Sequence, residues 1–204
     1  MNIAELLQQP NLNRVHLGQE LYSLCEERGP QYLLEELTDF PGKLILKGEE
    51  QLPFLLRIDL QPYLPPKATG KMLLHVFYQG DGDGLHSHPV EWAWAKILAG
   101  DGYVEQRQRE DLYLKGIEPE SFERLPGNEV AFNFLQSDYE ILHRVERLKG
   151  PFSMSLFQNG PRKDPEEWKI VLSDRSIWDM SQDQSYDKPF RSWKEVEHLL
   201  PDVF

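Results

Sequence analysis

The 204-residue sequence contains a single cysteine, Cys25, so no disulfide can form within the chain. It has no run of about 20 apolar residues, the length that spans a membrane, and its first residues lack the basic flank and apolar stretch of a signal peptide. Basic residues are scarce, at 22 against 34 acidic ones, which gives a net charge of −12. Nucleic acid and anionic lipid both require a basic face. We therefore expect a cytoplasmic protein with small-molecule partners and no nucleic-acid or membrane partner.

The first part of the sequence has a helical pattern. Apolar residues recur at intervals of three and four positions in two runs, which Pro30 separates. These residues are Leu17, Leu21, Leu24 and Cys25 in the first run and Tyr32, Leu33 and Leu37 in the second. Because proline suits the first turn of a helix, we expect two short helices within a helical N-terminal extension, residues 1–42.

From residue 43 onward the sequence consists of short apolar runs of alternating character, such as FLLRIDL, KMLLHVFYQ, WAWAKIL, DLYL and SMSLFQ. Turns rich in glycine and proline separate these runs. About ten short strands with no helices between them predict an all-β antiparallel sandwich or barrel over residues 43–180. Residues 181–204 are expected to form a tail with a short helix, for which Ser192 is the N-cap. One domain over residues 1–204 is the simplest organisation.

Two of the six histidines, His86 and His88, are separated by one residue. In a strand such residues point to the same side, so both imidazoles can reach one metal ion. A solvated surface turn is the usual alternative, but here a glycine-rich turn precedes the pair and an apolar strand follows it. His143 shares one strand face with Ile141 and Val145, where a histidine is either satisfied in the core or completes a metal site. We expect the three histidines to bind one metal ion.

These residues resemble the two signature motifs of the cupin superfamily. The residues at motif positions are Gly80, His86, His88 and Gly100 in the first motif and His143 in the second. The positions that depart from the motifs hold Ala93, in place of a glutamate, and Asp138, Glu140 and Arg147. The resemblance implies a cupin jelly roll, which is a double-stranded β-helix, with a metal ion inside it.

The pattern of three histidines without the glutamate resembles that of the thiol dioxygenases of the cysteine dioxygenase type. In those enzymes three histidines bind ferrous iron. The stretches LHSHPVEWAWAKILAGDGYVE and ILHRVER resemble the sequences around their ligands, and the resemblance covers residues 57–161. It implies iron(II) as the metal, with zinc, nickel or manganese as alternatives, and dioxygen and a small anionic substrate as partners. It also implies that Arg57 grips the substrate carboxylate; a solvated arginine on an edge strand is the alternative. Many cupins pair through edge strands, so a homodimer is compatible with the resemblance.

The strand after the third histidine departs from those dioxygenases, which carry serine, histidine and tyrosine there. Ser155 stands in for the serine, and Phe157 and Asn159 occupy the other two positions. With Arg57, Ser155 and Asn159 are the candidate catalytic residues. The segment NGPRKDPEEWKIV also resembles small bacterial cupins that have a His-x-His-Pro motif. A non-catalytic metal-containing binding or sensor protein and a redox-neutral isomerase or lyase therefore remain alternatives to the dioxygenase.

Other residues near the motifs have competing interpretations. Glu91 reaches the metal if the chain bends after Pro89, but an exposed position at the start of the next strand is the simpler expectation. Arg162 is a candidate anion contact at a strand end. In the alternating stretch 92–95, we expect one pair to face the pocket and the other to face a layer of core or helix. If the alanines face the pocket, the tryptophans pack against the N-terminal helices, and core packing is the expected role of both tryptophans. The histidines left without a role are His16, His75 and His198.

Overall fold

A computed structural model of the chain describes residues 3–10, 12–47, 49–50, 52–64, 70–81, 84–134, 139–163, 168–179 and 191–192. Two antiparallel sheets contain most of the regular structure in these segments. None of the helices described is long and apolar enough to cross a membrane.

The two sheets are named A and B. The strands of sheet A are, in spatial order, β13 (Arg191–Ser192), β1 (Pro41–Lys47), β2 (Leu52–Asp59), β3 (Met72–Phe77), β10 (Ser153–Asn159), β5 (Trp92–Gly100) and β8 (Glu129–Asn133). The strands of sheet B are β12 (Ile177–Asp179), β11 (Lys169–Leu172), β4 (Gly84–His86), β9 (Ile141–Leu148), β6 (Tyr103–Arg109) and β7 (Glu120–Arg124).

The strand order is that of a jelly roll. The chain alternates between the sheets, with β3, β5, β8 and β10 in sheet A and β4, β6, β7 and β9 in sheet B. The resulting orders, β3-β10-β5-β8 and β4-β9-β6-β7, are those of the eight-stranded double-sheet jelly roll. Strands β1, β2 and β13 extend sheet A beyond β3, and β11 and β12 extend sheet B beyond β4. The expected all-β jelly roll is confirmed.

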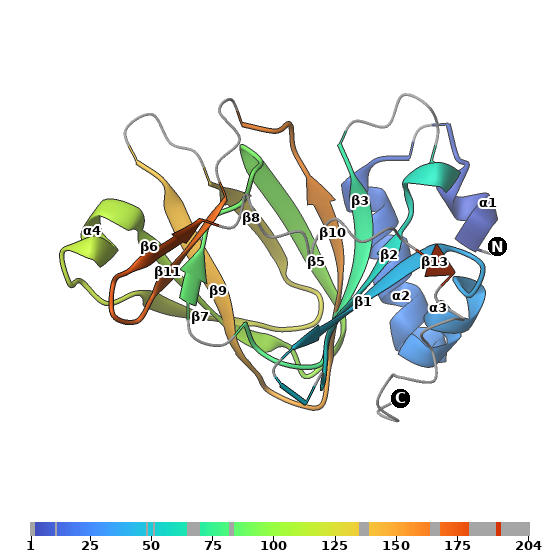
Figure 1. The fold of residues 1–204 in the computed structure, drawn as a ribbon. Helices are drawn as coiled ribbons and strands as arrows, with labels where there is room; N and C mark the ends of the chain where they lie inside the picture. The colour runs from blue at the N-terminus through green and yellow to red at the C-terminus, as the bar shows by residue number, and fades with distance from the viewer. Residues whose placement is uncertain are drawn as a thin grey trace.

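Three helices precede the sheets and cover the side of sheet A that faces away from sheet B (Figure 1). They are α1 (Ile3–Leu7), α2 (Arg14–Arg28) and α3 (Pro30–Glu36). The Asn13 side chain caps α2 by accepting a hydrogen bond from the His16 N–H at 2.9 Å, and Pro30 starts α3. The two expected N-terminal helices are confirmed as α2 and α3, whereas α1 was not expected.

The strands of sheet A have two apolar faces with different partners. Residues on the outer face, such as Leu74 and Leu156, pack into one core with the leucines of the helices. On the inner face Leu73 and Phe157 belong to a separate cluster, which faces sheet B. The period-2 alternation of the sequence thus separates the two faces.

The structure differs from the sequence-based expectation in several places. The run DLYL, expected as a strand, lies in helix α4 (Glu110–Leu114), whose two acidic residues in the first turn suit a helix N-terminus. Strand β7 was not expected, and a 3-10 turn, η1 (Gln61–Tyr63), follows β2. Strand β1 begins at Pro41, inside the segment expected to be helical. Ser192 ends β13, whereas the C-terminal helix that it was expected to cap lies outside the described residues.

Candidate metal centre

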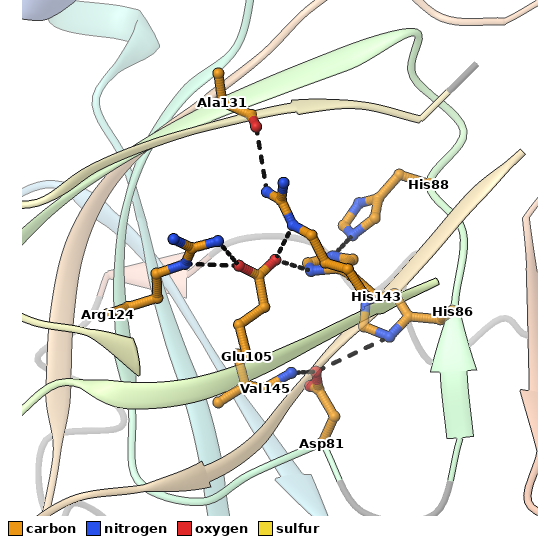
Figure 2. A network of polar contacts seen from close by, with 9 residues as sticks. Asp81, His86, His88, Glu105, Arg124, Ala131, His143 and Val145 are labelled. Atoms are coloured by element: carbon orange, nitrogen blue, oxygen red, sulfur yellow. Dashed lines mark hydrogen bonds and ion pairs between the residues drawn. The ribbon is translucent and has the colours of Figure 1, made fainter. Parts of the chain in front are cut away.

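The three predicted ligand histidines lie together between the sheets. His86 ends β4 and is paired directly with His143 of β9 in the antiparallel ladder. One ligand nitrogen from each of these residues and from His88 lies within 4.8 Å of the others. The Nε2 atoms of His88 and His143 are 2.9 Å apart (Figure 2). Three segments that are distant in the sequence therefore place their imidazoles at one point.

His88 lies beyond the end of β4, so strand alternation is not what aligns it with His86, as the sequence had suggested. The turn is held by the residue between them. The Ser87 N–H donates to the Lys169 carbonyl at 3.0 Å, and the Ser87 Oγ accepts from the Lys169 N–H at 3.1 Å. The His88 ring stacks on Phe134, with centroids 4.4 Å apart. These contacts bring the imidazole back to the cluster.

A buried carboxylate fixes the tautomer of His143. The Nδ1 atom of His143 lies 3.1 Å from Oε1 of Glu105, whose side chain is fully buried. Because a carboxylate only accepts hydrogen bonds, Nδ1 carries a hydrogen, and in the neutral ring Nε2 has the lone pair that points toward the other imidazoles. Histidines that bind metals usually have such a carboxylate on their other nitrogen.

Two arginines hold the Glu105 carboxylate from other sides. Arg107 Nε donates to Oε1 at 2.8 Å, and Arg124 donates to Oε2 from Nε at 2.8 Å and from its terminal nitrogen at 2.7 Å (Figure 2). Burial opposes ionisation of Glu105, but the hydrogen bond from His143 and the charge of Arg107 lower its pKa to about 2. Arg107 also donates to the Ala131 carbonyl of β8 at 3.2 Å. The carboxylate is therefore ionised and fixed in place.

The imidazoles of His86 and His88 are neutral at neutral pH. Burial lowers the pKa of His86 to about 4, although the carboxylate of Asp81, with Oδ2 3.9 Å from Nδ1, acts in the opposite direction. Burial also lowers the pKa of His88 well below its ordinary value, and the neighbouring histidines add to the effect. Deprotonated imidazoles are the form that binds metal ions. The His86 and His143 side chains remain 19% and 10% exposed, so solvent reaches the cluster.

Phenylalanines surround the imidazoles. Phe132 and Phe134 of the sheet A side lie 4.9 and 5.2 Å from the His143 ring, measured between centroids. Phe157 lies 6.4 Å from the His88 ring. The centre therefore has an apolar wall on the side of sheet A, which lowers the local dielectric constant and strengthens electrostatic interactions there.

The structure decides which pair of the alternating stretch in β5 faces inward. Ala93 and Ala95 belong to the inner-face cluster with the phenylalanines. Trp94 belongs to the core under the N-terminal helices, and Trp92 packs against that core. The small side chains thus face the inside of the jelly roll.

The three residues predicted to be catalytic all come from sheet A. Arg57 on β2 is paired with His75 of β3, and His75 is paired with Ser155 of β10. Asn159 ends β10 and is half-buried. Because β2 lies between β1 and β3, Arg57 is not on an edge strand. These residues lie on the sheet opposite the one that carries His86 and His143, and their catalytic roles stay predictions.

The remaining candidates are exposed or stand outside the histidine group among the described residues. Glu91 is exposed and, among the residues described, is not part of the histidine group, as the simpler expectation had it. Arg162 is exposed as well. Its neighbour Lys163 is buried and forms an ion pair with Glu140, which is also buried. His16 is exposed on α2, and His198 lies outside the described residues.

Two residues of this region were missed by the sequence analysis. Glu105 lies 38 residues before His143 and carries no motif, so only the pairing of β6 with β9 reveals it. His75 was named but given no role. The available signal was a histidine in the middle of the apolar run MLLHVF, which is an unusual position for a polar side chain.

The donor set fits a divalent transition metal. Three imidazoles suit iron, zinc, copper or nickel, and the fixed tautomer of His143 and the neutral state of His86 and His88 meet the requirement for free lone pairs. Three protein ligands leave coordination positions for other molecules, as catalytic sites require and closed structural sites do not.

No protein-family model matches the sequence, and no curated protein matches it. Several solved structures are similar in fold. The iron(II) form of HppE with an alternative substrate is 10% identical, with a TM-score of 0.39, over 58% of this chain and 55% of that one. A cupin sugar phosphate isomerase from Silicibacter pomeroyi is also 10% identical (TM-score 0.39; 72% and 92% covered), and an RmlC-like cupin protein from Ralstonia eutropha is 8% identical (TM-score 0.38; 79% and 87%). This chain thus spans about half the length of the first relative. Since one fold serves many activities, function has to be argued from the site.

Proposed function

We propose that the chain is a mononuclear iron(II) protein that oxidises a small anionic substrate, such as a thiol carboxylate, with dioxygen. The observation that carries the proposal is the convergence of His86, His88 and His143, with ligand nitrogens within 4.8 Å of one another. Within the described segments no carboxylate joins this group. The site therefore offers three neutral donors on one side and room for exogenous ligands on the other.

The charges around the site support an anionic substrate. Three neutral imidazoles leave both positive charges of a divalent ion uncompensated, which favours a thiolate or carboxylate as the next ligand. Glu105 does not offset this charge, because Arg107 and Arg124 already pair with its carboxylate. Arg57 on sheet A adds a guanidinium, whose planar fork suits a carboxylate.

Each part of the site has a distinct task in this proposal. Bound iron(II) would supply the open positions at which substrate and dioxygen meet. Glu105 keeps the hydrogen of His143 on Nδ1, and the stacked ring of Phe134 orients His88. The apolar wall limits the access of water to the reacting groups from the side of sheet A. Arg57 would bind the carboxylate and so fix the orientation of the substrate.

The test is oxygen uptake by the protein loaded with iron(II). We expect iron-dependent uptake with 3-mercaptopropionate or cysteine, loss of metal and of uptake in H143A, and unchanged uptake in H16A, which removes an exposed imidazole from α2. Confirmed binding of iron with no uptake across a panel of small thiols and other anionic chelators would refute the proposal.

A second candidate, a metal-containing binding protein without turnover, is favoured by one observation. Phe157, which packs beside His88, can neither donate nor accept a proton, although proton transfer is a common part of catalysis. For this candidate, iron-loaded protein should bind an anionic ligand and consume no oxygen. Zinc or manganese in protein purified without added metal, together with turnover that needs no oxygen, would instead support the redox-neutral isomerase or lyase.

A further inference from the structure

His75 lies in the middle of β3, on the inner face of sheet A. Its neighbours Leu74 and Val76 point the other way, into the core under the N-terminal helices. The His75 ring stacks on Phe157 of the inner face, with centroids 4.6 Å apart and an angle of 20° between the planes. Only 5% of the residue is exposed. A polar ring therefore occupies a position in an otherwise apolar strand.

The Nε2 atom of His75 is buried and has no hydrogen-bond partner in the part of the chain that is described. Buried polar atoms are nearly always hydrogen-bonded, and an exception calls for a reason, of which a ligand is one. Two atoms of β10, Ser153 Oγ and Asn159 Oδ1, have the same property, and strand alternation puts both on the face of Phe157. Three buried polar atoms that have no hydrogen-bond partner among the described residues thus lie on the inner face of two adjacent strands.

Arg57 and Ser155 flank His75 in the ladder. Residues directly opposite one another on neighbouring strands point to the same side, so a guanidinium, an imidazole and a hydroxyl form one polar row. Phe157 links the row to the metal centre, since its ring contacts His75 and also lies 6.4 Å from the ring of His88. Burial, with the charge of Arg57, lowers the pKa of His75 well below its ordinary value, so the imidazole is neutral.

We propose that His75 contacts the substrate: its Nε2–H donates to the carboxylate that Arg57 also binds, while the other end of the substrate reaches the three-histidine centre. The inference rests on the proposed function and narrows it to ligands with a carboxylate at one end and a metal-binding group at the other. Because Nε2 is covered in the structure, a neighbouring side chain has to move when the ligand enters. Arg57, which is half-buried and lies directly opposite His75 on β2, is the neighbour suited to this movement.

The test compares two thiols on the full-length protein loaded with cobalt(II) in the absence of oxygen. One is 3-mercaptopropionate, and the other is ethanethiol, which lacks the carboxylate; binding is followed by the absorbance of the cobalt–thiolate band. We expect H75F, which keeps an aromatic ring against Phe157, to weaken binding of 3-mercaptopropionate about tenfold. Binding of ethanethiol should stay unchanged.

Two conservative variants separate the contact from the fold. The amide nitrogen of H75Q reaches about as far as the imidazole Nε2 and should restore part of the affinity, whereas the shorter H75N should behave as H75F does. H16F is the matched control on the exposed α2 histidine and should change neither affinity. A comparison of H75Q with H75N tests the contact between His75 and the substrate even if H75F does not fold.

The outcomes distinguish this inference from the proposed function. If wild-type protein with bound cobalt takes up neither thiol, the proposed function fails and the inference with it. If the wild type binds 3-mercaptopropionate and the His75 variants bind it equally well, the inference alone is overturned. An equal loss of affinity for both thiols would also overturn it, because His75 would then act through the metal centre or the fold.

Discussion

The two faces of sheet A are built from the same strands and are both largely apolar, but they differ at the centre of the sheet. On the outer face, Leu74 and Leu156 are fully buried in the core shared with the helices. On the inner face, the positions next to them in sequence are occupied by His75 and Ser155, which are buried but polar. At these positions the outer face therefore contributes hydrophobic burial, whereas the inner face accepts polar groups, among them His75, whose Nε2 has no hydrogen-bond partner among the described residues. Polar groups buried in this way cost stability and are expected where a protein binds ligands.

The largest effect is expected from a cavity on the outer face. The substitution L156A should lower the free energy of unfolding by about 2–5 kcal/mol, because it removes a fully buried side chain from the core. Metal affinity, measured under conditions where the variant is folded, should not change. Denaturant unfolding and metal titration check the two parts. A large loss of metal affinity in the folded variant would show that the faces are not independent.

A smaller effect, and one confined to the metal, is expected from E105Q. The amide cannot hold the His143 tautomer as the carboxylate does, so metal affinity should fall about 10- to 100-fold. Competition with a chelator of known affinity measures this change. E123Q, which alters an exposed carboxylate paired with Lys149 at the surface, is the matched control. Unchanged affinity in E105Q would leave Glu105 with a purely structural role.

The pH dependence of the free energy of unfolding should reveal the buried imidazole of His75 on the inner face, which has no counterpart among the leucines of the outer face. The pKa of His75 is lowered in the folded protein because burial disfavours the charged form. The unfolded chain therefore binds a proton more readily below about pH 6.5, and stability falls as the pH drops. Metal-free wild type should lose up to about 1.4 kcal/mol more per pH unit than H75F in that range. Equal slopes in urea unfolding at several pH values would contradict this.

The smallest effect is expected at an exposed position of the same sheet. Leu52 starts β2 and is 48% exposed, so L52S should change the free energy of unfolding by less than about 0.5 kcal/mol. Urea unfolding beside L156A makes the comparison direct. A loss of several kcal/mol would mean that the position of a residue in the sheet, and not its burial, determines how much a substitution lowers the free energy of unfolding.

Much of this arrangement could be predicted from the sequence, because strand periodicity and the histidine spacing are local signals. The alternating pattern predicts most of the strands, and the motif around His86 and His88, with His143, predicts a cluster that the structure brings together. The same alternation predicts that one pair of residues in the stretch 92–95 faces inward, and the structure shows that this pair is the alanines. The helix α4 was misassigned, since four apolar and acidic residues fit one helical turn as well as a short strand.

The residues that the sequence could not identify depend on strand pairing. Glu105 reaches His143 across the β6–β9 ladder, where the register shifts between Val104 and Glu105. No pattern within one strand predicts such an irregularity. A role for His75 can be inferred only when its strand partners Arg57 and Ser155 are known. Arg57 precedes His75 in the chain and Ser155 follows it, each on a different strand.

The short length of β4 has a consequence for motion. Since the strand ends at His86, the backbone at His88 lies outside the sheet ladder and relies on Ser87 and on ring stacking to stay in place. An ion that joins the three imidazoles would act as a staple between this segment and two strands, and local opening there would become costly. Amide hydrogen exchange around residues 87–91 should slow on loading with metal, while the strands beneath the helices keep the rates they had before.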